Sequence, residues 1–471
     1  MAENTHDVVI IGGGPGGYPA AIRGAQLGLK VAVVEKEKLG GICLHKGCIP
    51  TKALLESAEH LYHARDESTD FGVVATDVSF DYAKVLDRKS QVVAQLHKGV
   101  QGLLKRNKVD VFFGTGTLTS PQTVHVESSA GGQDLSADNV VIATGSRPRS
   151  LPGLEIDGKA VISSDHALEL TTLPESVIIL GAGAVGVEWA SLLHDFGVAV
   201  TVVEIMPTLV PLEDKDIGKE LGRSFKRRGI TVKTDAKLLV ESLRTNEDAV
   251  TVDIEVKGRQ ESLQADVLLV AVGRIGNTEE LGLDALGIKS EGGIIPVDGY
   301  GRTNVPHVYA IGDVAGGFLL AHKATAEGHI AMEHLAGESS FPLDPLRVPR
   351  ATYCRPEIAS IGLLEEEAAA QGKEVKVGRF PFAALGKALI KGQTEGFVKM
   401  VCDAKTDEIL GTHVIGPGAT DIVAEMGLAQ LLEATPLEVG LNIHPHPTLA
   451  EAIMEASWDV DRRAVHVFRR R

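Results

Sequence analysis

Two cysteines, Cys43 and Cys48, are separated by four residues in the segment GGICLHKGCIPTK, residues 40–52. A turn at Gly47 can bring the two thiols together as a disulfide. The stretch that follows, with Pro50 near its first turn, predicts a helix. Cys48 would then lie at a helix N-terminus, where the helix dipole stabilises a thiolate. The spacing therefore indicates dithiol–disulfide redox chemistry.

A structural disulfide and half of a zinc site are the alternatives for this pair. No second CxxC and no histidine pair at metal-ligand spacing lies nearby, so zinc is disfavoured and we expect no metal. Four cysteines in 471 residues do not make a disulfide scaffold. In a reducing compartment a disulfide is expected to be catalytic. Cys354 and Cys402 have no partner motif and are expected to be small buried core thiols.

The chain contains one pattern twice: a buried strand, a glycine-rich turn, a helix and a second strand that ends in an acid. The two turns read GGGPGG and GAGAVG, and the second strands read VAVVE and VTVVE. The landmarks recur 169 residues on: Gly12, Gly14, Gly17 and Glu35 correspond to Gly181, Gly183, Gly186 and Glu204. Ordinary glycine-rich turns in a doubly wound sheet are the alternative, but two complete copies in register favour two dinucleotide sites.

Each part of this pattern has a physical role in dinucleotide binding. The first glycine makes the tight turn, the second lets the backbone approach a pyrophosphate, and the third allows close helix–sheet packing. The helix N-terminus offers free N–H groups to the phosphates. The terminal acids, Glu35 and Glu204, can accept hydrogen bonds from an adenosine ribose. Two sites suggest a flavin and a nicotinamide, and the acid at Glu204 favours NAD over NADP.

Composition bounds the class of protein. The length predicts about three domains, and the net charge of -16 disfavours nucleic-acid binding. The sequence has no run of eighteen apolar residues, so we expect no membrane span. The N-terminal MAENTH leaves no room for a signal peptide, so we expect none. The basic end, HVFRRR, is expected to be a solvated tail. We expect a cytoplasmic location, or a matrix-like one if the protein is organellar.

Dithiol chemistry also needs a base, because a substrate thiol must lose its proton before it attacks a disulfide. Histidine supplies a base near neutral pH, and a carboxylate partner fixes its tautomer. Near the C-terminus, HPHPTLAE places His444 and His446 between prolines and ahead of Glu451. Without further context a rigid surface turn with one hydrogen-bonded imidazole is the favoured interpretation of this segment.

GGICLHKGCIPTK closely resembles the redox-active segment of the pyridine nucleotide–disulfide oxidoreductases, and HPHPTLAE resembles the C-terminal motif of that family. The likeness extends over the whole chain. It implies that Cys43 is the interchange thiol that meets the substrate and that Cys48 lies against the flavin. It also implies that His446 is the base and Glu451 its partner. The role of His444 in the family is less certain.

The resemblance implies further contacts with the cofactors. Lys52 is expected near the flavin, paired with Glu188. The segment VVIATGSRP, residues 140–148, resembles the strand that ends the first flavin lobe, and TNVPHVYAIGDV, residues 303–314, resembles the segment whose aspartate binds the ribityl chain. The remaining expected cofactor contacts are Thr144, Gly145, Gly273, Asp313 and Ala321, with His322 and Lys323 beside the flavin ring.

The implied fold is α/β, with two Rossmann-like dinucleotide-binding domains, a central domain and an α+β C-terminal dimerisation domain. We expect an FAD-binding domain over 1–148, an NAD-binding domain over 149–275, a central domain over 276–345 and a dimerisation domain over 346–471. The implied enzyme is a homodimer in which Cys43 and His446 of one site come from different chains. It would oxidise dihydrolipoamide on the lipoyl domains of 2-oxo acid dehydrogenase complexes, with FAD and NAD as cofactors.

Several alternatives and departures accompany this assignment. A glutathione-type reductase would need phosphate-reading arginines, a mercuric reductase a C-terminal cysteine pair, and a transhydrogenase would lack the Cys43–Cys48 pair. A catalytically idle structural subunit is an alternative from another class. The departures from the family pattern are His45 for asparagine, Pro445 for alanine, Pro19 for a helix former, and Ile275-Gly276 where a proline is expected.

Overall fold

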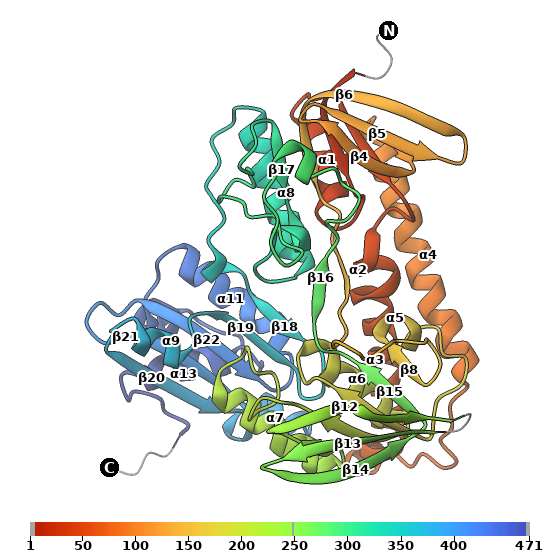
Figure 1. Ribbon diagram of the computed structural model, residues 1–471. Coiled ribbons are helices and arrows are strands. Elements are labelled where there is room, and N and C mark those ends of the chain that lie inside the picture. Colours follow the sequence, from red (N-terminus) through yellow and green to blue (C-terminus); the bar gives the residue numbers. More distant parts are fainter. Residues whose placement is uncertain (1–4, 247–248, 468–471) are drawn as a thin grey trace. The chain divides into compact units, whose positions relative to one another are not determined.

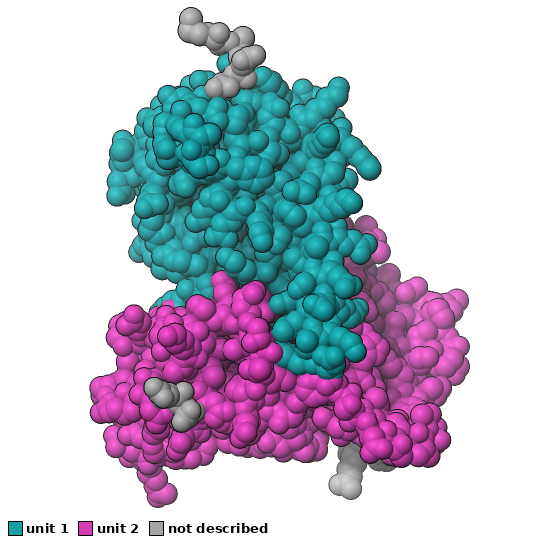
Figure 2. Space-filling view, turned by 90° about the vertical axis from the view of Figure 1, so that its right-hand side faces the viewer, with its two compact units in different colours: residues 1–54, 81–149, 273–345 teal, residues 55–80, 150–272, 346–471 magenta. Residues whose placement is uncertain are grey.

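The computed structural model describes residues 5–246 and 249–467 (Figure 1). The chain divides into two compact units, which Figure 2 shows in different colours. Unit 1 comprises residues 1–54, 81–149 and 273–345; unit 2 comprises 55–80, 150–272 and 346–471. The division of the sequence into four functional domains stays a prediction. The last four residues of the basic tail, 468–471, lie outside the described residues.

Unit 1 is built on a sheet with a parallel centre. Its strands are ordered β3-β2-β1-β6-β5-β4, and β17 also pairs with β6. The bounds are β1 Thr5–Ile11, β2 Val31–Glu35, β3 Asp110–Phe113, β4 Thr115–Ser120, β5 Thr123–Ser128, β6 Gly131–Ile142 and β17 Val308–Ala310. β1 and β2 are almost entirely buried, as expected for strands at the centre of a parallel sheet. A two-stranded ribbon of β7 (Ser146–Pro148) and β16 (Arg274–Gly276) belongs to the same unit.

The helices of unit 1 include α1 (Gly17–Gln26), α2 (Gly41–Lys46), α4 (Tyr82–Arg106) and α8 (Ala321–Leu335). α1 and α8 pack closely: an added Cβ at Gly328 would lie 2.8 Å from the Gly16 carbonyl oxygen. The short turns η3 (Asp284–Leu286), η4 (Gly312–Ala315) and η5 (Pro345–Arg347) complete the last segment. α4 has 25 residues and begins at Asp81, whose side chain accepts a hydrogen bond from the Lys84 N–H. Among the described residues, neither this helix nor any other is long and apolar enough to cross a membrane.

Unit 2 contains a second parallel sheet, ordered β11-β10-β9-β15-β8. Its strands are β8 Val161–Ser163, β9 Ser176–Leu180, β10 Ala199–Val203, β11 Thr231–Lys233 and β15 Val267–Val270. The associated helices are α5 (Ser164–Ala167), α6 (Ala184–Asp195) and α7 (Lys215–Arg228). An antiparallel sheet of β12 (Ala236–Thr245), β13 (Val250–Val256) and β14 (Arg259–Ala265) packs against it. The segment 55–80 adds the end of α3 (Cys48–Tyr62) and the turns η1 (His63–Glu67) and η2 (Ser68–Phe71).

The sequence duplication is a duplication of structure. β1 lies between β2 and β6 as β9 lies between β10 and β15, and all four pairings are parallel. The register is also the same, since Ile11 pairs with Val34 and Leu180 pairs with Val203. Each parallel sheet is followed by three antiparallel strands, β4-β5-β6 in one copy and β12-β13-β14 in the other. The prediction of two Rossmann-like folds is confirmed.

The C-terminal part of unit 2 is an antiparallel sheet ordered β18-β19-β22-β21-β20 with helices packed on it. The strands are β18 Arg350–Thr352, β19 Ile358–Gly362, β20 Val375–Pro381, β21 Phe397–Asp403 and β22 Ile409–Ile415. The helices are α9 Glu365–Ala370, α10 Gly386–Ile390, α11 Ala419–Leu431, α12 Pro436–Leu441 and α13 Glu451–Val460, with the turn η6 at Phe382–Ala384. α13 lies so close to β20 that an added Cβ at Gly378 would meet the Ala456 carbonyl oxygen at 2.1 Å.

A buried lysine joins the parallel-sheet part of unit 2 to its C-terminal part. Lys399 on β21 has a side chain only 2% exposed, and its Nζ lies 2.9 Å from Asp214 and from Asp216 and 2.7 Å from Glu365. The two aspartates lie at the start of α7 in the parallel-sheet part, and Glu365 begins α9 in the C-terminal part. Burial lowers the pKa of Lys399, but its three carboxylate partners outweigh burial and hold that pKa above the ordinary value.

Replacing this lysine tests how strongly the buried charges hold unit 2 together. Lys399→Met leaves buried carboxylates without their cation, which is expected to cost about 3–5 kcal/mol of unfolding free energy in urea at neutral pH. Lys376→Met is the matched control, because Lys376 on β20 also pairs with two aspartates but is more exposed. The control is expected to cost about 1 kcal/mol or less. Equal losses in the two variants would contradict this account.

Candidate active site

Cys43 and Cys48 form a disulfide with a Cα–Cα distance of 4.7 Å. The connection is more structured than the simple turn expected from the sequence. Cys43 lies within the short helix α2, and Cys48 is the first residue of α3. Gly47 separates the two helices, with a φ of -146° and a ψ of -115°. A Cβ added to Gly47 would press against the backbone of Ile42 and Cys43. Cys48 therefore stands at the N-terminus of a 15-residue helix, as the sequence predicts.

The redox segment lies directly against the first glycine loop. A Cβ added to Gly41 would lie 2.7 Å from the Gly14 Cα, so the approach of the two backbones requires a glycine at position 41. The Gly40 N–H also donates to the Gly13 carbonyl oxygen at 2.8 Å. Gly40 itself has a φ of 102°, which starts α2 from a left-handed residue. Local backbone packing thus brings the disulfide-bearing helix beside the predicted pyrophosphate loop.

His45, the departure from the family pattern, helps to hold α2 in place. Its Nε2 donates to the Leu39 carbonyl oxygen at 2.9 Å, and His97 on α4 donates to the same oxygen through Nδ1 at 2.9 Å. The two rings meet edge to face with centroids 5.0 Å apart. Burial lowers the pKa of His45, and the neighbouring His97 lowers it further, whereas the hydrogen bond to Leu39 raises it by less. The ring is therefore neutral at physiological pH and serves as a hydrogen-bond donor.

The two glycine loops share one geometry. A Cβ at Gly12 would meet the Ala143 carbonyl oxygen at 2.3 Å, and a Cβ at Gly181 would meet that of Ala271 at 2.5 Å. The third glycines are packed equally closely. A Cβ would lie 1.8 Å from the carbonyl oxygen of the first glycine at Gly17, and 1.9 Å from it at Gly186. The middle positions are open: the nearest atom to a Cβ at Gly14 is 3.8 Å away, and none lies within 4 Å at Gly183.

These open positions fit a dinucleotide pyrophosphate. Neither α1 nor α6 has a side chain that caps its N-terminus, so the first backbone N–H groups of each helix are available to phosphate oxygens. A side chain at the middle glycine would fill the space that the phosphates need. The glycine loops therefore have the shape that FAD and NAD require, and the assignment of individual glycines to each cofactor stays a prediction.

The two terminal acids are buried and make equivalent contacts. The Glu35 carboxylate accepts hydrogen bonds from the N–H groups of Gly13 at 2.8 Å and Glu37 at 2.7 Å. The Glu204 carboxylate accepts from Ala182 at 2.6 Å and Met206 at 2.8 Å, positions that are again 169 residues on. A carboxylate has about four acceptor sites, so each acid retains capacity for ribose hydroxyls. Each acid thus ties the glycine loop to the end of the second strand.

Asp313 is held by a relay that the sequence did not reveal. The Ser146 hydroxyl donates to Asp313 at 2.5 Å and itself accepts from Arg274 Nε at 2.7 Å. Arg274 also donates to the Ser146 carbonyl oxygen at 2.9 Å. The three residues are far apart in sequence. Ser146 lies on β7 and Arg274 on β16, which pair with each other, and Asp313 lies in η4. Nothing in the spacing of the chain could have identified Ser146 or Arg274.

The other predicted cofactor contacts of this part of the chain also belong to unit 1. Thr144 donates through Oγ1 to the Asn277 carbonyl oxygen at 2.7 Å, and Gly145 accepts from the Asn277 N–H at 3.0 Å. Gly273 accepts from the Arg149 N–H at 3.0 Å. Ala321 begins α8 and is followed by His322 and Lys323. Lys323 is buried and pairs at 2.6 Å with Glu327, whose pKa burial raises above its ordinary value despite that pairing.

Lys52 and Glu188 fall in different compact units. Lys52 lies on α3, one turn after Cys48. Glu188 on α6 is buried, and its carboxylate accepts the Tyr353 N–H at 2.9 Å. The pairing of these two residues stays a prediction.

His446 and Glu451 form the expected pair in unit 2. His446 Nδ1 lies 2.9 Å from Glu451 Oε1, and the His446 side chain is 78% exposed. The other oxygen of Glu451, the first residue of α13, accepts the Thr448 N–H at 2.8 Å. Burial raises the pKa of Glu451, but the hydrogen bonds from Thr448 and His446 outweigh it and hold that pKa below the ordinary value. An ionised Glu451 makes Nδ1 the protonated nitrogen, which leaves Nε2 as a free base.

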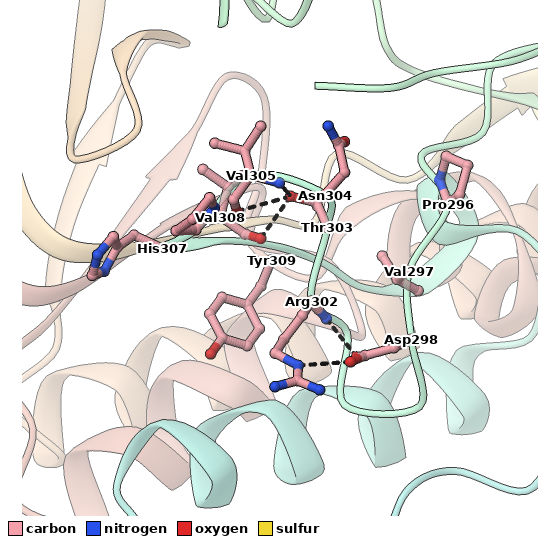
Figure 3. Close-up of a pocket in the computed structure, with 11 residues that line it drawn as sticks. Pro296, Val297, Asp298, Arg302, Thr303, Asn304, Val305, His307, Val308 and Tyr309 are labelled. Carbon is pink, nitrogen blue, oxygen red and sulfur yellow. Dashed lines mark hydrogen bonds and ion pairs between the residues drawn. The ribbon is translucent and has the colours of Figure 1, made fainter. Parts of the chain in front are cut away.

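A surface pocket of about 510 Å³ lies elsewhere in unit 1 (Figure 3). It is lined by residues 296–298 and 302–309, and none of the predicted site residues is among them. Its charged residues pair with each other, since Arg302 Nε donates to Asp298 at 2.6 Å. Among the residues described, no three histidine, cysteine or acidic side chains are grouped so that they could hold a metal ion.

Comparison with known proteins agrees with this geometry. The family model described as pyridine nucleotide-disulphide oxidoreductase matches residues 6–328, and the dimerisation domain of the same family matches residues 348–457. Dihydrolipoyl dehydrogenase of Bacillus subtilis is 52% identical over 98% of this chain and 99% of that protein. Dihydrolipoyl dehydrogenase of Zymomonas mobilis is 45% identical over 99% of this chain and 100% of that protein.

Solved structures agree as well. The crystal structure of LpdA from Mycobacterium tuberculosis matches with a TM-score of 0.89 and 28% identity, covering 96% of this chain and 98% of that one. The Cu(II) complex of the flavoprotein disulfide reductase RclA from Escherichia coli has a TM-score of 0.85 and 27% identity, covering 96% and 99%. The sequence resemblance is therefore confirmed, and the chain belongs to the pyridine nucleotide–disulphide oxidoreductase family.

Proposed function

We propose that this protein is an FAD-dependent enzyme that oxidises protein-bound dihydrolipoamide to lipoamide and reduces NAD. One observation carries the proposal: the Cys43–Cys48 disulfide lies on a helix whose backbone touches a dinucleotide loop. A disulfide in that place can exchange electrons with a bound dinucleotide on one side and with a dithiol on the other. The similarity to dihydrolipoyl dehydrogenases over nearly the whole chain supports the choice of dihydrolipoamide as the substrate.

The dithiol half of the reaction is thiol–disulfide exchange. His446 Nε2 takes the proton of one substrate thiol, and Glu451 stabilises the imidazolium that forms. The substrate thiolate attacks Cys43 Sγ, which breaks the Cys43–Cys48 bond and leaves Cys48 as a thiolate. The second substrate thiol attacks the mixed disulfide at the substrate sulfur, and its proton passes to the departing Cys43 sulfur. This step releases lipoamide and the Cys43 thiol, while His446 keeps the first proton. Two electrons have then moved from the substrate to the cysteine pair.

The two cysteines are suited to different roles. Cys48 is the first residue of α3, where the unpaired N–H groups of the helix stabilise its thiolate as a leaving group. Cys43 lies within α2 and is only partly buried, so we assign it the contact with substrate. FAD, when bound, accepts the electron pair of the cysteines and transfers it to NAD as a hydride.

The residues of the second loop favour NAD over NADP. Glu204 presents a carboxylate at the ribose end of that site and would repel a 2′-phosphate. The residues that follow it, Ile205 and Met206, supply no positive charge for such a phosphate. Lys52, Thr144, Gly145, Asp313 and Ala321 are proposed to contact FAD, and Glu188 to pair with Lys52. Gly273 is proposed as a further cofactor contact.

We further propose a homodimer in which His446 serves the disulfide of the partner chain. The chain carries the dimerisation domain of its family. A group of large apolar side chains on and beside α11 and α12 is more than half exposed in the single chain: Leu428, Leu431, Leu432, Leu441 and Ile443. Exposed apolar clusters of this kind mark protein interfaces. A second copy of the chain is their proposed partner, and the lipoyl domains of 2-oxo acid dehydrogenase complexes are the proposed source of substrate.

The proposed chemistry suits a cytoplasmic location. Cys354 and Cys402 are buried free thiols, as the sequence predicts, and unpaired thiols of this kind fit a reducing compartment. Burial raises the pKa of the Cys402 thiol to about 12 and raises that of Cys354 as well, so neither is a nucleophile at neutral pH.

Substitution of Cys48 tests the route of the electrons. The FAD-loaded protein is expected to form NADH from dihydrolipoamide, and Cys48→Ser is expected to lower that rate about a thousandfold or more, because no disulfide can accept electrons. Cys354→Ser is the matched control, since a serine hydroxyl can donate the bond that Cys354 makes to the Pro356 carbonyl oxygen. NADH formation that survives in Cys48→Ser would refute the disulfide route. Absence of turnover in the wild-type protein would point to another disulfide substrate.

Substitution of His446 tests the base. His446→Gln is expected to lower the rate of dihydrolipoamide oxidation about 10²–10⁴-fold, since the substrate thiol loses its proton acceptor. NADH-dependent reduction of ferricyanide by the same preparation should be unchanged, because that reaction needs no thiol base. Unchanged dihydrolipoamide oxidation would remove His446 from the mechanism.

A further inference from the structure

The loop over residues 442–450, which joins α12 to α13, carries two histidines in different surroundings. His446 is largely exposed, whereas the side chain of His444 is 3% exposed. A proline follows each of them, so the backbone around both rings has restricted freedom. The mechanism above uses only His446, and the buried ring of His444 has no role in it.

Glu425 on α11 binds the first half of this loop. His444 Nε2 lies 2.9 and 3.1 Å from the two carboxylate oxygens of Glu425. The side-chain amide of Asn442 donates to the same carboxylate at 3.2 Å. The loop is therefore attached to the core of the C-terminal sheet domain through a residue 19 positions earlier in the chain.

The hydrogen bonds of His444 determine its charge. Its Nδ1 lies 2.8 Å from the Asn442 carbonyl oxygen, and its Nε2 faces the Glu425 carboxylate. Both partners can only accept hydrogen bonds, so both ring nitrogens must carry a proton. The hydrogen bond with Glu425 raises the pKa of His444 above its ordinary value, against the opposing effect of burial. Glu425 and His444 are thus a partly buried ion pair.

Glu451 binds the second half of the loop through His446 and the Thr448 N–H. The positive charge of His444 also acts on Glu451 and contributes to its lowered pKa, after burial and the hydrogen bonds of Thr448 and His446. Two carboxylates therefore hold the two halves of one loop, and the imidazolium between them favours the ionised form of the acid that orients His446.

We propose that the Glu425–His444 ion pair is a positioning device for His446, which fixes the loop that presents this base and balances the charge around Glu451. The proposal rests on the proposed function, in which His446 is the base. His444 does not contact the reacting thiols in this account. It acts through the backbone of the loop and through Glu451.

The titratable groups that act on His444 are Glu425 from α11 and Glu451 from α13. The pKa of His444 is raised in the folded protein above the ordinary histidine value of 6.5. The stabilisation that comes from protonated His444 is therefore complete below pH 6.5 and is lost as the pH rises through the raised pKa. The raised pKa of His444 therefore extends the range in which the pair holds the loop towards neutral pH, where the base must work.

The test compares three variants of the FAD-loaded protein. His444→Gln removes the positive charge, and Glu425→Gln/His444→Gln removes both charges of the pair. His466→Gln is the matched control, because His466 pairs at 2.7 Å with Glu455 on α13 but does not touch the 442–450 loop. The measurement is kcat for dihydrolipoamide oxidation against pH, with NADH-dependent ferricyanide reduction as the measure of an intact flavin site.

His444→Gln is expected to lower kcat about tenfold at its optimum, because the base is held less firmly. Its acid limb should move up by about half a pH unit or more, since Glu425 without its counter-charge makes the surroundings of the base more negative. The double variant should return the acid limb to the wild-type position while kcat stays low. Ferricyanide reduction should be unchanged in both, and His466→Gln should match the wild type.

A wild-type pH profile in His444→Gln, or an equal shift in His466→Gln, would overturn the proposal. A wild-type kcat in the double variant would also overturn it. The double variant still decides the question if His444→Gln fails to fold because the Glu425 carboxylate is left without its partner. Failure of the proposed function is distinguishable, because it would appear as unchanged dihydrolipoamide oxidation in His446→Gln.

Discussion

The site depends on a backbone contact between two glycines. Gly41, in the first turn of the disulfide-bearing helix, touches Gly14 of the first dinucleotide loop, and a Cβ at Gly41 would lie 2.7 Å from the Gly14 Cα. A side chain at Gly41 would separate the loop from the helix. Since electron exchange between a disulfide and a bound dinucleotide requires them to be neighbours, the chemistry proposed for Cys43 and Cys48 follows from this contact.

The duplicated scaffold explains how one chain can hold two dinucleotides with different tasks. Both copies use a parallel strand pair in the same register, an uncapped helix N-terminus and a buried acid bound to two backbone N–H groups. The copies differ in what surrounds the loop. The disulfide-bearing segment packs on the first copy, and the acids at the start of α7 tie the second copy to the C-terminal sheet through Lys399.

Elements defined by local spacing could be predicted from the sequence. The two glycine loops, their strands and the helix that begins at Cys48 were identified because hydrophobic period and glycine position determine them locally. The hydrogen bonds of Ser146, Arg274 and Asp313 could not be identified, because strand pairing brings together residues more than a hundred positions apart. The buried state of His444 was equally hidden, since its partner Glu425 lies on another helix and only the tertiary fold determines which of the two loop histidines is exposed.

Electrons that travel between the substrate and NAD are proposed to pass through one disulfide. The most direct measurement is alkylation of the native FAD-loaded protein with iodoacetamide, before and after one equivalent of NADH without oxygen, followed by mass analysis of its peptides. The account predicts that NADH makes Cys43 and Cys48 reactive, while Cys354 and Cys402, both buried, stay unlabelled throughout. Loss of flavin colour with Cys43 and Cys48 still joined would contradict it.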